Sequence, residues 1–174
     1  LEQAGCSRRA SDAVYACAGE PLSLRLFTTA GSAARSRTAE QLQSQLRSIG
    51  VEVKPEYAPA GTLLGQLLPQ GHWDLAIFAW EANPRERRFL HEIYGCGGSR
   101  NWTGYCQRLV TGDLEQSDRI VDADQRARVL NRADRRLAQD MPVLPLFQTT
   151  LLGAVRTTVH GFVLNPGGDV TWNA

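Results

Sequence analysis

Alternating and periodic apolar positions predict a strand–helix–strand order near the start of the chain. Residues 21–29 (PLSLRLFTT) place a leucine at every second position, which is the period of a half-buried strand. Residues 36–50 instead repeat apolar side chains every three or four positions and stop at a glycine, with Ser36 or Thr38 near the start of the predicted helix. Alternation returns in residues 51–58, where Pro55 indicates an edge strand or a bulge.

A short helix and a buried strand follow. Residues 62–71 (TLLGQLLPQG) carry four leucines on one helical face and end in a proline and a glycine. The run DLAIFAW, residues 74–80, is continuously apolar, as expected for a central strand covered on both faces. This alternation predicts an α/β fold with a mixed, mostly parallel sheet flanked by helices.

The second half of the chain is predicted to be helical on both sides of a glycine-rich loop, residues 95–106 (GCGGSRNWTGYC). Asn83 and Pro84 form an N-cap and N1 pair for a helix with apolar side chains facing inward at Phe89, Leu90 and Ile93. Asp122 and Gln125 form a capping box that predicts the start of a long helix. The apolar stripe of this helix is Ala127, Leu130, Ala133 and Leu137. Two extended segments are predicted after it, at 142–150 and 151–162.

Length and composition favour one folded domain over residues 1–174. The chain has 43% apolar and 21% charged residues, without an apolar run near the roughly 18 residues that a membrane span needs. The net charge of +1 gives no general electrostatic reason to bind nucleic acid or an anionic membrane. Lys54 is the only lysine among many arginines, which indicates a bacterial source. The opening LEQAG is typical of a helix end capped by glycine, so we expect a piece of a longer protein.

Four cysteines form two pairs that are close in sequence, Cys6 with Cys17 and Cys96 with Cys106. Of the three possible pairings, this local one has the lowest loop-closure cost, and it predicts two disulfides and an oxidising, extracytoplasmic location. Free buried thiols are the alternative. A zinc site is disfavoured because the chain lacks a CxxC spacing and its histidines are scattered, at positions 72, 91 and 160.

Catalytic signatures are absent from the sequence. It contains no GxSxG nucleophile turn and no phosphate-binding glycine motif, and Asp122 with Asp124 stand where a helix start favours negative charge. We therefore expect no catalytic residue, no cofactor and no metal ion, and thus a protein that is not an enzyme.

Aromatic and amide side chains are the best candidates for a functional site. Trp80 ends the apolar run, at a sheet edge where ligands of α/β proteins collect, and Asn83 follows three residues later. Three more candidates lie on the glycine-rich loop: Asn101, Trp102 and Tyr105. Rings give contact area with few torsions to restrict, and polar groups give adaptable hydrogen bonds, so this set predicts a binding surface. The alternative is that these rings only pack beneath a loop.

The order of several segments resembles the C-terminal lobe of the family 5 extracellular solute-binding proteins, the peptide- and nickel-binding subunits of ABC importers. The resemblance covers nearly the whole chain. It is carried, in order, by PLSLRLFTT, RTAEQLQSQLRSIGVEVKPE, GHWDLAIFAW, NWTGYC and RARVLNRADRRLAQDMPVLPLFQ. It implies a periplasmic-binding-protein-like fold in which two lobes close on a ligand, with this chain supplying most of one lobe. Residues 165–174 pack either on this lobe or against the other, and the sequence leaves both alternatives open.

The resemblance also implies roles for individual residues. In the oligopeptide binders of this family, a strand-end tryptophan and an acidic residue three positions later line the cleft, and the acid holds the terminal amine of the peptide. Trp80 matches the first position, whereas Asn83 replaces the acid with a neutral amide, and Glu81 is a partial substitute. The glycine-rich loop matches a cleft-facing segment, which nominates Asn101 and Tyr105.

The function implied by the resemblance is that of a substrate-binding component that takes a peptide or similar small organic solute to an ABC permease. The expected location is extracytoplasmic, at the cell surface or in the periplasm, with a lipid anchor outside this chain as the only membrane attachment. One alternative is a binding-protein lobe reused as a sensor or structural module. A secreted hydrolase is the third hypothesis.

Overall fold

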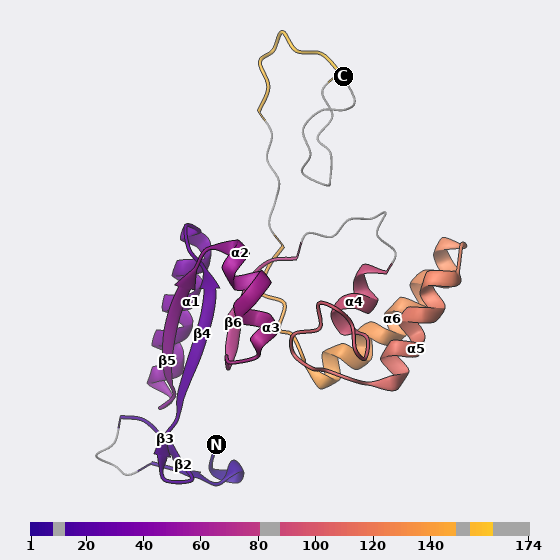
Figure 1. The fold of residues 1–174 in the computed structure, drawn as a ribbon. Helices are drawn as coiled ribbons and strands as arrows, with labels where there is room; N and C mark the ends of the chain where they lie inside the picture. Colours follow the sequence, from indigo (N-terminus) through magenta and orange to yellow (C-terminus); the bar gives the residue numbers. More distant parts are fainter. Residues whose placement is uncertain (9–12, 81–87, 149–153, 162–174) are drawn as a thin grey trace. The chain divides into compact units, whose positions relative to one another are not determined.

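A computed structural model describes residues 1–8, 13–80, 88–148 and 154–161 (Figure 1). The chain divides into two compact units, Leu1–Ala79 and Trp80–Ala174, and each is described by itself. Within the described ranges, no helix has both the length and the apolar character needed to cross a membrane. The single domain stays a prediction, and both alternatives for residues 165–174 stay open, because that segment lies outside the described residues.

The first unit is built on a three-stranded parallel sheet in the order β5-β4-β6. Its strands are β4 (Ser23–Thr29), β5 (Glu52–Ala58) and β6 (Leu75–Ile77). Leu26 of the central strand pairs with Pro55 on one side and Leu75 on the other, and it is only 1% exposed. The predicted α/β fold with parallel strands is confirmed, as is the edge position of the strand that contains Pro55 within the described sheet.

Helix α1 (Ala33–Ser48) packs on this sheet through a core of Leu26, Ala39 and Val53 (Figure 1). The helix begins earlier than the sequence predicted, because Ser32 is the residue whose hydroxyl accepts a hydrogen bond from the backbone N–H of Arg35 (3.4 Å). Ser36 lies in the first turn of the helix, near its start as predicted, but Ser32 is the capping residue. A hydroxyl inside a helix can bond a preceding carbonyl instead, and Thr38 Oγ1 does so with Ala34 O (2.9 Å).

Three short helical segments connect β5 to β6, namely α2 (Ala60–Thr62), the π-helical η2 (Leu63–Leu67) and α3 (Leu68–Gln70). They bury Leu63 and Leu68 completely. Strand β6 differs from the predicted central strand over residues 74–80. It has three residues with half-buried side chains, and it lies at an edge of the described sheet. A continuous apolar run fixes neither strand length nor position in a sheet, so β4 takes the central place.

A small antiparallel sheet at the start of the chain was not predicted. It follows a 3₁₀ turn, and its elements are η1 (Glu2–Ala4), β1 (Cys6–Ser7), β2 (Ala16–Cys17) and β3 (Glu20–Pro21). The predicted disulfide between Cys6 and Cys17 is confirmed, and it joins two residues paired in register. Next to this sheet, the backbone N–H of Tyr15 donates to Gly50 O (2.8 Å), which fixes the small sheet against the turn between α1 and β5.

The second unit contains α4 (Phe89–Tyr94), α5 (Arg108–Arg119) and α6 (Ala123–Asp140). The predicted cap of α6 is confirmed, because Asp122 Oδ1 accepts from the N–H of Gln125 (2.7 Å). Two details of the predicted helices are wrong: Ala127 is exposed while Val129 is buried, and Leu90 is 37% exposed. The two predicted extended segments form no strand in residues 141–148 and 154–161.

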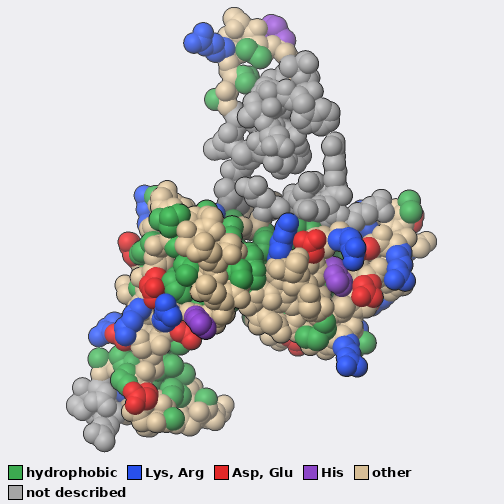
Figure 2. Space-filling model, viewed as in Figure 1, with side chains coloured by type: hydrophobic (Ala, Val, Ile, Leu, Met, Phe, Trp, Pro, Cys, Tyr) green, Lys and Arg blue, Asp and Glu red, His purple; other side chains and the backbone are tan. Residues whose placement is uncertain are grey.

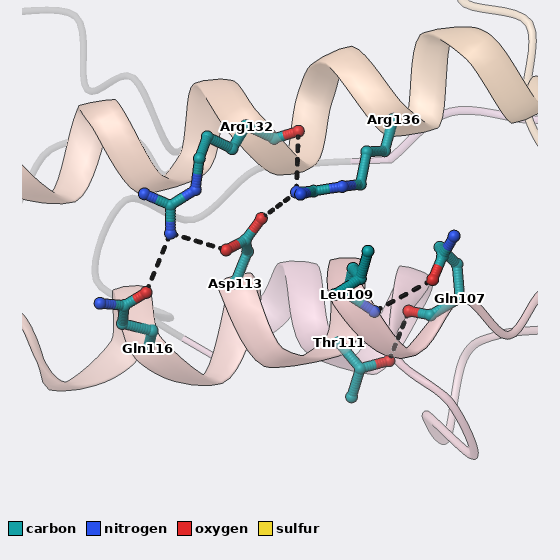
Figure 3. Close-up of polar contacts among 7 residues, drawn as sticks. All are labelled: Gln107, Leu109, Thr111, Asp113, Gln116, Arg132 and Arg136. Atoms are coloured by element: carbon teal, nitrogen blue, oxygen red, sulfur yellow. Dashed lines mark hydrogen bonds and ion pairs between the residues drawn. The ribbon is translucent and has the colours of Figure 1, made fainter.

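A buried carboxylate joins α5 to α6 (Figure 3). Asp113 is 8% exposed and accepts hydrogen bonds from two arginines of α6. Arg132 donates to Asp113 Oδ1 (2.8 Å) and also to Gln116 Oε1 (3.0 Å), and Arg136 donates to the other Asp113 oxygen. A buried charge is stable only when it is paired, so this network holds the two helices in one register. On the face shown in Figure 2, basic and acidic side chains are intermixed, in keeping with the net charge of +1.

Candidate ligand-binding site

The glycine-rich loop of residues 95–106, here called the stapled loop, connects α4 to α5. The predicted disulfide between Cys96 and Cys106 is confirmed and closes the loop at its two ends. Two glycines let the loop lie directly against α4. A Cβ atom added at Gly95 would be 2.5 Å from His91 O, and one added at Gly98 would be 2.3 Å from Glu92 O. Any larger residue at these two positions would push the loop away from the helix.

Asn101 organises the loop from inside. Its Nδ2 donates to Gly95 O (2.8 Å) and to Tyr105 O (2.6 Å), and its Oδ1 accepts from Thr103 Oγ1 (3.0 Å). The side chain is half-buried and bridges the beginning and the end of the loop. The structure therefore gives Asn101 a positioning role, and its predicted contact with a ligand stays a prediction.

Tyr105 attaches the loop to the end of α6. Its ring packs against a core of Val110, Leu114 and Ala133, and its hydroxyl donates to Asp140 Oδ2 (2.7 Å). Burial of the phenol, followed by the hydrogen bond to Asp140, raises its pKa to about 12. The structure thus gives Tyr105 an anchoring role, and its predicted contact with a ligand also remains untested.

Trp80, Phe89 and Trp102 form an aromatic cluster, which keeps that name below. The rings of Trp80 and Trp102 are stacked, with centroids 5.1 Å apart and an interplanar angle of 23°. Phe89 meets Trp80 edge to face at 5.7 Å and is buried, whereas both tryptophans are half-buried. Arg100 lies over the Phe89 ring, with its guanidinium carbon 5.8 Å from the centroid.

The cluster can offer flat apolar surface that is already in place before a ligand arrives. Stacked and edge-to-face rings contribute beyond the area that they bury, and the disulfide and Asn101 restrict the loop that carries Trp102. No group of three or more metal-binding side chains occurs in the ranges that the structure describes. The arrangement suits the binding of an organic molecule.

The structure brings together two of the six predicted ligand residues, Trp80 and Trp102, in direct contact. Asn101 and Tyr105 lie on the same loop, and Glu81 and Asn83 lie outside the described residues. Two members of the site were missed. Phe89 was assigned to the core from its helical spacing, and Arg100 was passed over although it stands next to Asn101 in the sequence.

We predict that Tyr105 makes stability depend on pH in the alkaline range. An unfolded tyrosine titrates near about pH 10, so between about pH 10 and about pH 12 the native state keeps a proton that the unfolded state loses. The free energy of unfolding therefore falls as the pH rises through this window. Urea unfolding at about pH 8 and about pH 11 should show a larger loss for the natural protein than for Tyr105→Phe.

The control for this prediction is Tyr57→Phe on β5, because Tyr57 is 45% exposed. Its pH profile should match that of the natural protein. An unchanged profile for Tyr105→Phe would contradict the anchoring role of the phenol.

Comparison with known structures shows which fold this chain has. The fold is that of a periplasmic-binding-protein-like lobe, as predicted. The structure of the oligopeptide-binding protein AppA from Bacillus subtilis, in complex with a nonapeptide, matches 82% of this chain and 29% of that chain, with a TM-score of 0.70 and 23% identity. NikZ from Campylobacter jejuni, in complex with Ni(L-His), matches 81% of this chain and 29% of that chain, with a TM-score of 0.67 and 18% identity.

Sequence comparison then gives particular relatives. A dipeptide-binding protein of Pseudomonas aeruginosa is 24% identical over 131 residues, which is 74% of this chain and 24% of the relative. AppA of Bacillus subtilis is 24% identical over 174 residues, or 98% of this chain and 32% of the relative. No family model matches the chain. The resemblance to family 5 solute-binding proteins is confirmed, and the chain spans about a quarter to a third of the length of these relatives.

Proposed function

We propose that this chain is a ligand-binding lobe of an extracytoplasmic solute-binding protein that captures a peptide or similar small organic solute for an ABC importer. The observation that carries the proposal is the stacking of Trp80 on Trp102 at a half-buried position. Preorganised rings bind a guest without a further cost of ordering them. The relatives are named as peptide-binding proteins, which favours binding without chemistry over a hydrolase or a reused structural module.

The partners follow from the same proposal. A second lobe would supply the rest of the contacts, because the chain covers only 24% to 32% of these relatives. A permease would then receive the solute, and a lipid anchor outside this chain would hold the protein at the membrane. Two disulfides suit a location outside the cytoplasm, where the environment is oxidising.

We predict that the natural full-length protein binds peptides through the aromatic cluster. Mass spectrometry of ligand that co-purifies with it should identify a peptide or similar organic solute. Calorimetry with that solute should show saturable binding, and Trp80→Ala should weaken it by about thirtyfold, since truncation of an aromatic hot-spot residue costs about 2 kcal/mol.

The control for this measurement is Trp73→Ala in the first unit. Trp73 is half-buried, and its Nε1 donates to Leu68 O (3.1 Å), so it has a structural contact within its own unit. Binding that survives Trp80→Ala unchanged would argue against this site. A lack of uptake across peptide, sugar and metal-chelate libraries would remove the transport role.

A further inference from the structure

Arg100 places a positive charge at the aromatic cluster. Its guanidinium carbon is 5.8 Å from the centroid of Phe89, a distance at which a cation is attracted to the face of a ring. Phe89 in turn contacts Trp80, so the charge belongs to the same group of side chains. Arg100 also precedes Trp102 by two residues in the stapled loop, and both side chains leave the same constrained backbone.

The position of Arg100 is fixed by Glu92 on α4. The backbone N–H of Arg100 donates to Glu92 O (3.0 Å), and its Nε lies 3.3 Å from Glu92 Oε2. The arginine side chain remains 40% exposed. A guanidinium has five N–H donors, so a contact through Nε leaves others for a second acceptor at the surface. The charge is therefore preorganised and accessible.

The cation at the cluster favours an anionic group over an ammonium group. Arg100 lies over the ring of Phe89, and its ion pair with Glu92 is made through Nε, at 3.3 Å. Arg100 would repel an ammonium group placed against the cluster.

We propose that the site selects solutes that carry a carboxylate beside an apolar or planar group and that need no free ammonium. The planar group would contact the aromatic cluster, while the carboxylate accepts hydrogen bonds from Arg100. This inference rests on the proposed function and specifies the chemical class of its ligand. Arg100 is the residue that would determine the selectivity, since among the described residues it is a cation in contact with a ring of the cluster.

The test uses the natural full-length protein and one tripeptide library in two end-blocked forms. In the first form the amine is acetylated and the carboxylate is free. In the second the amine is free and the carboxylate is amidated. Peptides retained by the protein are counted by mass spectrometry, and the first form should be preferred at least about tenfold, as expected for one charge-assisted hydrogen-bonded contact.

Variants of Arg100 then test whether this residue causes the preference for a free carboxylate. For the peptide retained most strongly, Arg100→Gln should lower the affinity about tenfold, and Arg100→Lys should restore only part of it because the paired donors are lost. Arg128→Gln is the matched control, since it removes the same charge from an exposed position on α6. Near-ultraviolet circular dichroism of the stacked tryptophans should be unchanged in all three variants.

The outcomes separate the two proposals. An equal or greater retention of the free-amine form overturns the carboxylate selectivity and leaves solute binding intact. So does an unchanged affinity in Arg100→Gln, or an equal loss in Arg128→Gln. Retention of neither form overturns both the selectivity and the proposed capture of peptides.

Discussion

Gly98→Ala is expected to destabilise the second unit by about 2–3 kcal/mol and to separate Trp102 from Trp80. The added Cβ would be 2.3 Å from Glu92 O, 2.7 Å from the Glu92 carbonyl carbon and 2.7 Å from His91 O. These are backbone atoms of α4, which cannot rotate away as a side chain can. Relief requires the stapled loop to move off the helix, and this movement would break the hydrogen bond from Arg100 N to Glu92 O.

Urea unfolding measures the loss of stability, and near-ultraviolet circular dichroism reports the stacked indoles. Gly112→Ala is the control, because a Cβ at this position in α5 has open space around it. Replacement of a glycine by alanine within a helix should raise stability, by up to about 1 kcal/mol. The two substitutions thus have opposite expected signs. A Gly98→Ala protein as stable as the natural one would show that the loop does not need this close approach.

The second large effect is expected when the disulfide of the stapled loop is removed. Replacing both Cys96 and Cys106 by serine should lower the free energy of unfolding by about 3 kcal/mol, because the cross-link restricts the unfolded chain. It should also weaken the circular dichroism signal of the tryptophan pair, since Trp102 lies between the two cysteines. Ligand affinity should fall as well, because the loop must then be ordered during binding.

The first unit supplies a matched control. The bond between Cys6 and Cys17 spans 11 residues and that between Cys96 and Cys106 spans 10, so their effects on the unfolded chain are similar. Replacing Cys6 and Cys17 by serine should therefore destabilise the protein while preserving the signal of Trp80 and Trp102. An equal loss of that signal in both double variants would refute a specific link between the loop disulfide and the cluster.

Strands β4 and β5 of the parallel sheet were predictable because they carry period-two alternation, and α1 because its apolar spacing is helical. Helix α5 was missed because its buried face includes Asp113 and Ser117, which interrupt an apolar stripe. Asp113 can be buried because Arg132 and Arg136 of α6 form ion pairs with it, and these contacts exist only in the folded state. The strands of the N-terminal sheet have two residues each, which is too short for any periodic signal.

The sequence predicted the part of the candidate site that two cysteines close into a loop. It did not predict the roles of side chains whose hydrogen-bond partners are brought together only by folding. Two cysteines around glycines and aromatic residues predicted a closed loop, and Trp80 and Trp102 do meet. The polar groups of Asn101 and Tyr105 were expected to face a ligand. Their partners Gly95 and Asp140 are contacts made by folding, and residue type alone cannot reveal them.

Strand β5 has a further consequence for work with this protein in concentrated solution. In the described sheet it pairs with β4 on one side only, and the N–H that a neighbouring molecule would need is missing at Pro55. Lys54 and Glu56 beside it are exposed and charged. An edge of this kind resists the addition of a foreign strand. Polymerisation through this side of the sheet is therefore disfavoured, which benefits calorimetry and spectroscopy at high concentration.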